Sequence, residues 1–320
     1  MGELSSTNKY NFLVTAANGD LGEAVAGVLR DSFPDAGIYG VDAMGIYPAS
    51  MYFDSVSIIS TGGSTQYQTE LVEVAKNVEA THIIPCSDPE IAALAESSGI
   101  KEFRCSILMP QFELVTTFID KWIGSNWLDS HSFPIPNTVL LTDAKTMDLP
   151  LIVKPRLGSG SVGFFRVRSK ELLYGLQVEF GDSYIAQEDL GSDTPEYTCA
   201  VVSKNGCVNT VVMERRLDAG RTVQITIIKN ENVEDIIKRF VDITKLDGPI
   251  NLQMKETTSG PKIFEINPRF SSTVKMRHLL GFRDLEWLIK SYKELKHFPR
   301  YYPQYGMSAY RLSRELLRSS

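Results

Sequence analysis

The chain has 320 residues, of which 43% are hydrophobic and 22% are charged, and its formal net charge is −6. This apolar content excludes a disordered protein and is enough for about two domains with cores of their own. The acidic balance disfavours a nucleic-acid partner, although a local cluster of cations on such a protein can still bind a nucleoside triphosphate.

Segments that would place the protein in or across a membrane are not visible in the sequence. No apolar run approaches the roughly 18 residues that a membrane helix needs, and Met1–Tyr10 lacks the apolar centre of a signal peptide. The four cysteines form neither a C-x-x-C motif nor a disulfide framework, so we expect free thiols; they are Cys86, Cys105, Cys199 and Cys207. These features predict a cytoplasmic protein with no membrane partner.

The N-terminal third alternates between short apolar runs and helical patterns. The strands that we expect are Asn11–Ala16, Gly37–Asp42 and Thr81–Cys86. A helix should follow the first strand and run to Arg30, a second should span Tyr67–Ala80, and a third should begin at Ser87-Asp88-Pro89. Such alternation predicts a parallel sheet with helices on its faces, in a domain that ends near Pro110.

The rest of the chain has a different pattern, typical of an α+β domain with a mostly antiparallel sheet. We expect helices over Gln111–Asp129, Val233–Thr244, Asp284–Leu295 and Ser308–Leu317. The expected strands are Asn137–Leu141, Leu151–Lys154, Tyr184–Glu188, Tyr197–Ser203, Val208–Glu214, Ile250–Met254 and Lys262–Ile266. The dipeptide Asn205-Gly206 predicts a two-residue hairpin turn that places Cys207 opposite Lys204.

A glycine turn, Thr15–Gly22, follows the first strand and has two interpretations. It resembles the dinucleotide-binding turn of nucleotide-sugar dehydrogenases and epimerases, and Tyr292 and Lys296 have the Tyr-x-x-x-Lys spacing of such enzymes. However, Ala16 or Ala17 stands where the first glycine of that turn belongs, and the Tyr–Lys pair lies in a charged C-terminal helix. We therefore favour a structural strand-to-helix turn and a solvated helix face.

The segment Pro150–Gly163 is more specific. A buried strand ends in Lys154, and a loop containing Gly158, Gly160 and Gly163 follows at once. Burying a lone lysine is costly, so this one should have an anionic partner, and the loop offers free backbone N–H groups to phosphate oxygens. A plain hairpin turn with an exposed lysine is the alternative.

The segment Ile263–Ser272 carries the second chemical pattern. On an extended strand Glu265 and Asn267 point to one face, and Gln253 on the neighbouring predicted strand alternates in the same way. Oxygen ligands on adjacent strands suit Mg²⁺, and Arg269 can stabilise charge on a transferring phosphoryl group. The alternative is a polar sheet face in water.

Together these two segments resemble the ATP-grasp superfamily, and within it the large chain of carbamoyl phosphate synthase and its shorter relatives. The resemblance covers most of the chain; the other motifs are Pro85–Glu90, Asp120-Lys121-Trp122, Pro134–Thr138 and Ala186–Gly191. It implies a Rossmann-like pre-ATP-grasp domain over residues 1–110 and an ATP-grasp domain with antiparallel sheets over residues 111–320. The latter would comprise a small lid subdomain at about 111–190 and a large subdomain at about 191–320.

The resemblance also implies roles for single residues. Lys121 and Lys154 would contact the phosphates of ATP, and Arg269 with Lys154 would stabilise the transferring phosphoryl group. Magnesium ligands would be Gln253, Glu265 and Asn267. The lid loop over the phosphates would include Gly158, Ser159, Gly160, Ser161 and Gly163. Glu188 and Leu190 would offer backbone groups to adenine, and Glu196 would lie at the ribose. The acceptor carboxylate would meet Arg215, Arg216 or Arg221, unless these arginines form a solvated loop.

The chain holds one ATP-grasp unit, whereas the carbamoyl phosphate synthase large chain has two. We therefore expect a free-standing ATP-dependent ligase that joins a small carboxylate to an amine through an acyl phosphate, with ATP and Mg²⁺. The alternatives are a kinase on the same fold, a nucleotide-binding subunit without chemistry, and an NAD-dependent dehydrogenase or epimerase. A homodimer is expected only because dimers are common.

Overall fold

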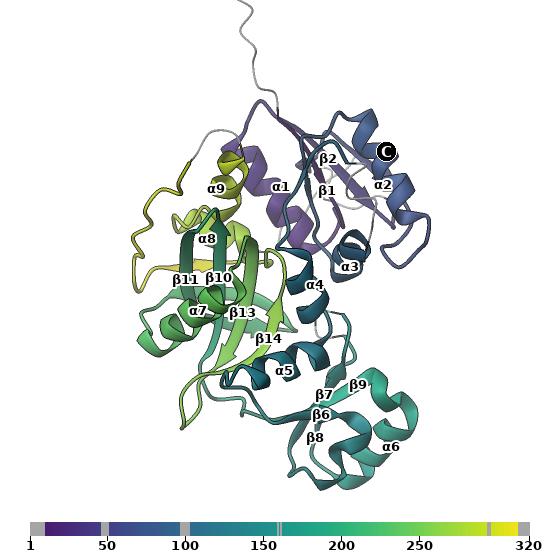
Figure 1. Cartoon of the computed structure of the whole chain (residues 1–320), viewed down its shortest axis with the longest axis vertical. Coiled ribbons are helices and arrows are strands. Elements are labelled where there is room, and N and C mark those ends of the chain that lie inside the picture. Colours follow the sequence, from purple (N-terminus) through teal and green to yellow (C-terminus); the bar gives the residue numbers. More distant parts are fainter. Residues whose placement is uncertain are drawn as a thin grey trace, which may run out of the picture.

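The computed structural model describes residues 10–45, 51–96, 103–158, 160, 162–292 and 296–312. These residues form one parallel and two antiparallel sheets, arranged along the length of the molecule (Figure 1). No helix in the described part of the chain is long and apolar enough to cross a membrane. The four cysteines are free, as predicted.

The first sheet is parallel, as predicted, with the strand order β3-β2-β1-β4-β5. Its strands are β1 (Asn11–Val14), β2 (Gly37–Asp42), β3 (Ser55–Ile58), β4 (His82–Ile84) and β5 (Ser106–Ile107). Its helices are α1 (Asp20–Ser32), α2 (Tyr67–Asn77) and α3 (Asp88–Glu96). The sequence did not predict β3 and β5, because one is mostly exposed at the sheet edge and the other has only two residues.

The second sheet is small and antiparallel, in the order β6-β9-β7-β8, and lies at the far end of the molecule from α2 (Figure 1). Its strands are β6 (Thr138–Leu140), β7 (Leu151–Pro155), β8 (Phe165–Val167) and β9 (Tyr184–Glu188). The helices packed on it are η3 (Leu141–Thr146), α6 (Lys170–Phe180) and η4 (Gly181–Ser183). Its buried side chains form a separate core, so this sheet packs as a unit.

The third sheet is the largest, with the order β14-β13-β10-β11-β12-β15. Its strands are β10 (Glu196–Lys204), β11 (Cys207–Asp218), β12 (Arg221–Ile227), β13 (Gly248–Lys255), β14 (Lys262–Asn267) and β15 (Ser308–Tyr310). The remaining helices are α7 (Glu231–Thr244), α8 (Val274–Leu279) and α9 (Asp284–Ser291). The hairpin turn at Asn205-Gly206 is confirmed, and Cys207 pairs with Lys204.

The prediction of one long helix over Gln111–Asp129 is wrong. The segment forms two helices, α4 (Phe112–Phe118) and α5 (Lys121–Ser130). Asp120 has an extended backbone, and its carboxylate accepts hydrogen bonds from the N–H groups of Trp122 and Ile123. An N-cap of this kind starts a new helix, which the apolar periodicity on both sides of Asp120 conceals.

The predicted helix over Ser308–Leu317 is also wrong where the structure describes it. Residues 308–310 are strand β15, which pairs with the edge of β12. Likewise α9 ends at Ser291, before Tyr292, so Tyr292 and Lys296 do not share a described helix. Tyr292 packs edge-on against His82, with ring centroids 5.8 Å apart. In these terminal segments, tertiary contacts decide the conformation, although the spacing of apolar residues is helical.

One hydrophobic core joins the first and third sheets. It contains Phe12 and Val14 of the parallel sheet together with Ala200 and Met213 of the antiparallel sheet, and Phe282 packs among them. We propose a division of the chain near residue 110, because β5 ends just before it and α4 starts just after it. The shared core means that the two parts pack as one body around their common boundary.

A buried ion pair fastens the loop that follows β14. The Arg277 guanidinium donates to Asp284 Oδ2 from Nε at 3.0 Å and from Nη2 at 2.6 Å. Its Nη1 donates to the hydroxyls of Ser271 and Thr273, both at 3.0 Å. Both charged side chains are almost completely buried, so neither can exchange its partner for water.

We predict that Asp284→Ala lowers the free energy of unfolding by about 3–5 kcal/mol, because it leaves the Arg277 charge buried without a counter-charge. Urea titration followed by circular dichroism measures the change. The control is Glu231→Ala, which removes the carboxylate of an exposed pair with Lys229 and should cost far less, because water screens that pair. Equal costs for the two variants would contradict this prediction.

Candidate functional site

A cavity of about 780 Å³ lies where the three sheets meet. The small sheet contributes Ile152 and Lys154, the large sheet contributes Gln253 and Glu265, and the first domain contributes residues around Gly19. Most of the site residues predicted from the sequence line this cavity: Lys121, Lys154, Gly158, Gly160, Glu188, Leu190, Glu196, Gln253, Glu265, Asn267 and Arg269. Residues from distant parts of the chain therefore form one site.

Three predicted loop residues require separate comment. Ser159 and Ser161 lie outside the described residues. Gly163 is not among the residues that line the cavity. It has a φ of +71°, and a Cβ at this position would lie 2.5 Å from Tyr184 Oη. This glycine is therefore explained by backbone conformation and close packing, whatever else the loop does.

Lys154 is the buried cation of the cavity. Its Nζ donates to Gln187 Oε1 at 3.1 Å and to the Phe264 carbonyl at 3.2 Å. The carboxylate of Glu265 lies 4.0 Å away. These contacts place the lysine between β9 of the small sheet and β14 of the large sheet. Thus most of its neighbours are neutral acceptors.

The charge on Lys154 is incompletely compensated. Burial lowers the pKa of Lys154 to about 8, Glu265 acts in the opposite direction, and the nearby charge of Lys121 lowers the pKa further. Lys121 itself, at the start of α5, donates to the Gly158 carbonyl at 2.5 Å. Two cations that share one cavity favour the binding of an anion between them.

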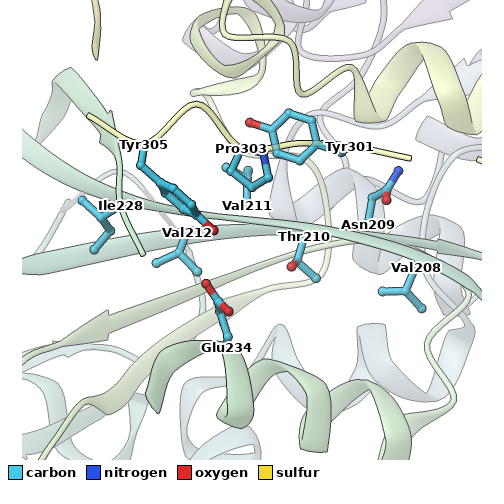
Figure 2. A pocket seen from close by; sticks show the side chains of 10 residues that line it. All are labelled: Val208, Asn209, Thr210, Val211, Val212, Ile228, Glu234, Tyr301, Pro303 and Tyr305. Carbon is cyan, nitrogen blue, oxygen red and sulfur yellow. The ribbon is translucent and has the colours of Figure 1, made fainter. Parts of the chain in front are cut away.

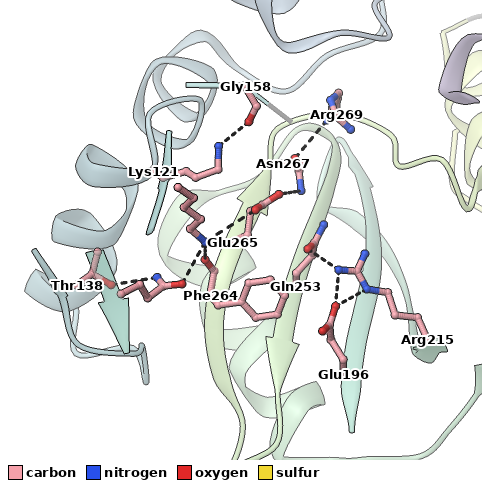
Figure 3. A network of polar contacts seen from close by, with 12 residues as sticks. Lys121, Thr138, Gly158, Glu196, Arg215, Gln253, Phe264, Glu265, Asn267 and Arg269 are labelled. Carbon is pink, nitrogen blue, oxygen red and sulfur yellow. Dashed lines mark hydrogen bonds and ion pairs between the residues drawn. The ribbon is translucent and has the colours of Figure 1, made fainter. Parts of the chain in front are cut away.

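The polar residues of β13 and β14 face each other in register. Gln253 is paired with Glu265, and Asn251 is paired with Asn267. The Asn267 side chain donates to Glu265 Oε1 at 3.1 Å. Figure 3 shows the Glu265 carboxylate beside the Asn267 side chain. The predicted alternation is therefore observed, and it concentrates oxygen atoms on one face of the sheet.

Arg269 connects this face to the first domain. Its Nε donates to Asp88 Oδ1 at 2.7 Å, and its Nη2 donates to Asn267 Oδ1 at 3.3 Å. Burial alone would lower the pKa of Arg269, but the charge of Asp88 and the hydrogen bond to it, together with the charge of Glu265, raise the pKa. The guanidinium therefore stays charged, at a position fixed from two sides of the cavity.

Glu196 belongs to a second network of charged side chains. Arg215 donates from Nε to Glu196 Oε1 at 2.7 Å and from Nη2 to Gln253 Oε1 at 2.8 Å. Lys255 lies 3.7 Å from the other Glu196 oxygen. Figure 3 shows Arg215 reaching both groups across the sheet. Arg215 is therefore not a free acceptor-binding residue, and Arg216 does not line the cavity.

The end of the cavity that borders the first domain carries another cluster. Arg221 donates twice to the Asp20 carboxylate, at 2.6 and 2.7 Å, and Arg311 donates to it at 3.2 Å. Asp20 is the first residue of α1, and Gly19 and Ser272 line the same end. The two arginines share the Asp20 carboxylate, and Glu23 of the same helical turn also acts on Arg311.

The glycine turn before α1 has the properties of a structural turn. The Ala16 N–H donates to Glu90 at 3.1 Å, and the Asn18 N–H donates to Asp42 at 2.9 Å. A Cβ on Gly22 would lie 2.3 Å from the Ala16 carbonyl oxygen. Carboxylates already occupy the N–H groups that a pyrophosphate would need, and Gly22 is required for close packing.

Sequence reasoning missed several residues that build the cavity. Asp88 was interpreted only as a possible helix cap, although it holds Arg269 from 181 positions away. Gln187 is 4% exposed and also donates to Thr138 Oγ1 at 3.0 Å. A polar residue inside the apolar pattern of β9 was the available signal for Gln187. No local signal pairs Asp88 with Arg269.

The family model described as "ATP-grasp in the biosynthetic pathway with Ter operon" matches residues 184–312. This range contains the third sheet and the strand β9 that leads to it. No curated protein matches the sequence. The match therefore covers the part of the chain that supplies Glu265, Asn267 and Arg269.

Solved structures of known proteins share the fold. One is the ADP complex of N5-carboxyaminoimidazole ribonucleotide synthetase, with a TM-score of 0.68, 15% identity, and coverage of 88% of this chain and 76% of that chain. The enzyme of that name from Thermotoga maritima has a TM-score of 0.67, 16% identity, and coverage of 89% and 76%.

Another is the biotin carboxylase domain dimer of the Hydrogenobacter thermophilus 2-oxoglutarate carboxylase, in complex with MgADP, ADP and bicarbonate. It has a TM-score of 0.71 and 14% identity, with coverage of 91% of this chain and 71% of that chain. At such identities the likeness concerns the fold. It confirms the predicted architecture of an N-terminal domain with a parallel sheet followed by antiparallel sheets.

We predict that the stability of the protein rises between pH 8 and pH 10.5 because of Lys154. In this window the unfolded chain keeps a proton that the folded protein has lost from Lys154, whose folded pKa is lowered to about 8 from 10.5. The gain amounts to about 3 kcal/mol over the window. Lys154→Met should be more stable than the wild type at pH 7 and should lose this advantage by pH 10.5.

Urea titrations of the ligand-free protein at several pH values measure the effect. The control is Lys238→Met, which replaces an exposed lysine of α7. Its free energy of unfolding should follow that of the wild type at every pH. The prediction is contradicted if the free energies of unfolding of Lys154→Met and of the wild type differ by the same amount at every pH. In that case burial does not lower the pKa of Lys154.

Proposed function

We propose that this protein, whose chain has the ATP-grasp fold, is an ATP-dependent ligase that joins a carboxylate to an amine through an acyl phosphate. The observation that carries the proposal is the buried ammonium group of Lys154, whose nearest carboxylate in the cavity, that of Glu265, is 4.0 Å away. A phosphate group would complete its neutralisation. The names of the structures that share the fold support the same chemical class, since they include synthetases and carboxylases bound to ADP.

We place the adenine of ATP between the small and large sheets. Ile152 and Phe264 offer apolar surfaces on the two sides of the cavity there. The Glu188 N–H already donates to the Asn137 carbonyl, so Glu188 would offer its own carbonyl oxygen to the adenine amino group, and Leu190 would offer a backbone group beside it. The ribose would lie near Glu196.

The triphosphate would extend from there toward the polar face of β13 and β14. Lys154 and Lys121 would contact its oxygens, and the loop over Gly158–Gly163 would cover it. That loop presents exposed apolar side chains to the cavity, namely Val162 and Phe164. Closure of the loop over the phosphates would exclude water, which would otherwise hydrolyse an acyl phosphate.

The donor set on β13 and β14 fits Mg²⁺. This ion prefers oxygen ligands and takes one or two carboxylates, together with substrate phosphates and water. Glu265 supplies a carboxylate, and Asn267 and Gln253 supply amide oxygens on the same face. Gln253 would exchange its hydrogen bond with Arg215 for the metal. A bound Mg²⁺ would neutralise part of the charge on the phosphates.

In the reaction, the substrate carboxylate would attack the γ-phosphoryl group, and an amine would then displace phosphate from the acyl phosphate. Arg269, held by Asp88, would stabilise the phosphoryl group during both steps. Positioning and charge neutralisation account for this chemistry, so no nucleophilic side chain of the protein is needed. The carboxylate would enter from the end of the cavity that Arg221 lines.

A cytoplasmic location and a homodimeric state remain expectations from the sequence. The NAD-dependent alternative is disfavoured, because Glu90 and Asp42 occupy the N–H groups of the glycine turn.

We predict that Glu265→Gln abolishes turnover, because an amide in place of the carboxylate removes the one negative ligand of the proposed metal site. The measurement is phosphate release from ATP and Mg²⁺ in the presence of panels of carboxylates and amines, with the product identified by mass spectrometry. The matched control is Glu214→Gln, which makes the same change at an exposed position of β11 outside the cavity lining. The control should keep wild-type activity.

Several outcomes would contradict the ligase. ADP formation that needs no carboxylate would exclude it, and a stable phosphorylated product without an amide would indicate a kinase. The absence of magnesium-dependent turnover with any panel would favour a nucleotide-binding subunit. Full activity of Glu265→Gln would remove this residue from the metal site while leaving the ligase possible.

A further inference from the structure

A second pocket, of about 240 Å³, lies on the third sheet and shares none of its lining residues with the main cavity. It is formed by one stretch of β11, by α7 and by the C-terminal segment over residues 301–305 (Figure 2). The residues that line it are Val208, Asn209, Thr210, Val211, Val212, Ile228, Glu234, Tyr301, Pro303 and Tyr305. The proposed ligase reaction uses none of them.

The pocket exists because β11 is longer than its neighbour β12. The pairing between the two strands ends at Met213 and Ile227, while β11 begins at Cys207. The Ile228 N–H donates to the Val212 carbonyl, so that carbonyl points away from β10. By the alternation of an antiparallel strand, Thr210 and Val208 direct their carbonyls, and also their N–H groups, to the same side. Among the described residues, no strand pairs with them there.

The C-terminal segment passes over this open strand edge and is fastened at both ends. Asn209 Nδ2 donates to the Pro299 carbonyl at 3.0 Å, and the Gly306 N–H donates to the Ile227 carbonyl at 2.8 Å. Between these two points the segment supplies the aromatic rings of Tyr301 and Tyr305. One hydrogen bond from a side chain and one between backbone groups therefore fix the pocket wall.

The pocket contains a carboxylate without a partner. The Glu234 side chain makes no hydrogen bond or ion pair with any described residue, and Lys229, whose charge interacts with it, already donates to Glu231 at 2.6 Å. Tyr301 Oη is buried and has no hydrogen-bond partner in the described part of the chain. Burial, and secondly the neighbouring Tyr305, raise the pKa of Tyr301 to about 12. Figure 2 shows the Tyr305 hydroxyl directed toward Glu234.

We propose that this pocket binds a small organic amine in its ammonium form. A carboxylate and outward-facing backbone carbonyls accept hydrogen bonds from an ammonium group, and the rings of Tyr301 and Tyr305 attract a cation through their faces. An anion would meet the charge of Glu234, and a hydrocarbon would leave the carbonyls without partners. The volume of about 240 Å³ restricts the ligand to a small molecule.

Isothermal titration calorimetry of the full chain with putrescine tests this proposal, with butanediol as the neutral molecule of the same carbon chain. Putrescine should bind saturably, and butanediol should not. Glu234→Gln should weaken putrescine binding by about tenfold or more, the loss expected for one charge-assisted contact. Tyr305→Leu should weaken it as well, because it removes one ring.

The matched control is Glu231→Gln, which makes the same charge change on the same helix, α7, outside the pocket lining. It should keep the wild-type affinity, and circular dichroism melting should show that each variant is folded. The proposal is overturned if putrescine does not saturate, if butanediol binds equally well, or if both glutamate variants lose the same affinity. None of these readouts depends on ATP turnover. The experiment therefore tests the amine site independently of the proposed ligase activity.

Discussion

Two buried cations, Lys154 and Arg269, line the main cavity, and a third, Arg277, lies behind its lining residues Ser271 and Thr273. Each of these charges needs a counter-charge, and the fold supplies them unequally. Arg277 is neutralised by Asp284, and Arg269 is neutralised by Asp88. Lys154 has only a carboxylate at 4.0 Å and neutral acceptors. The two arginines therefore contribute to the folded framework, because each has a complete set of partners. The lysine is the one of the three whose charge is left for a ligand to complete.

The same charges explain how the walls of the cavity are held together. Arg269 and Asp88 join the large sheet to the first domain, and the core shared by the first and third sheets supports that contact from below. The small sheet is attached differently: Arg156 at the end of β7 donates to Asp120 at 2.7 Å, beside the start of α5. The first and third sheets thus form a rigid base, and the small sheet packs separately above the cavity. This arrangement would suit the proposed reaction, which must exclude water after its substrates have entered.

Sequence reasoning predicted those parts of the fold in which a pattern is local. The strands around Lys154 and Glu265 and the turn at Asn205-Gly206 appear as expected, because burial alternates along a strand and turns need particular residues. It failed at Asp120, where one helix cap divides a continuous apolar pattern. It failed again at Ser308–Tyr310, where an exposed strand edge decides the conformation of the segment that packs on it.

The sequence by itself determined which residue types stand at the ends of β7 and β14, and so which chemistry the site can carry. The tertiary structure alone decided which distant partner each of them has. Asp88 meets Arg269, and Arg215 takes the Gln253 side chain, through contacts that no spacing along the chain encodes. Local alternation is set by neighbouring residues, whereas the pairing of buried charges depends on how whole sheets pack against one another.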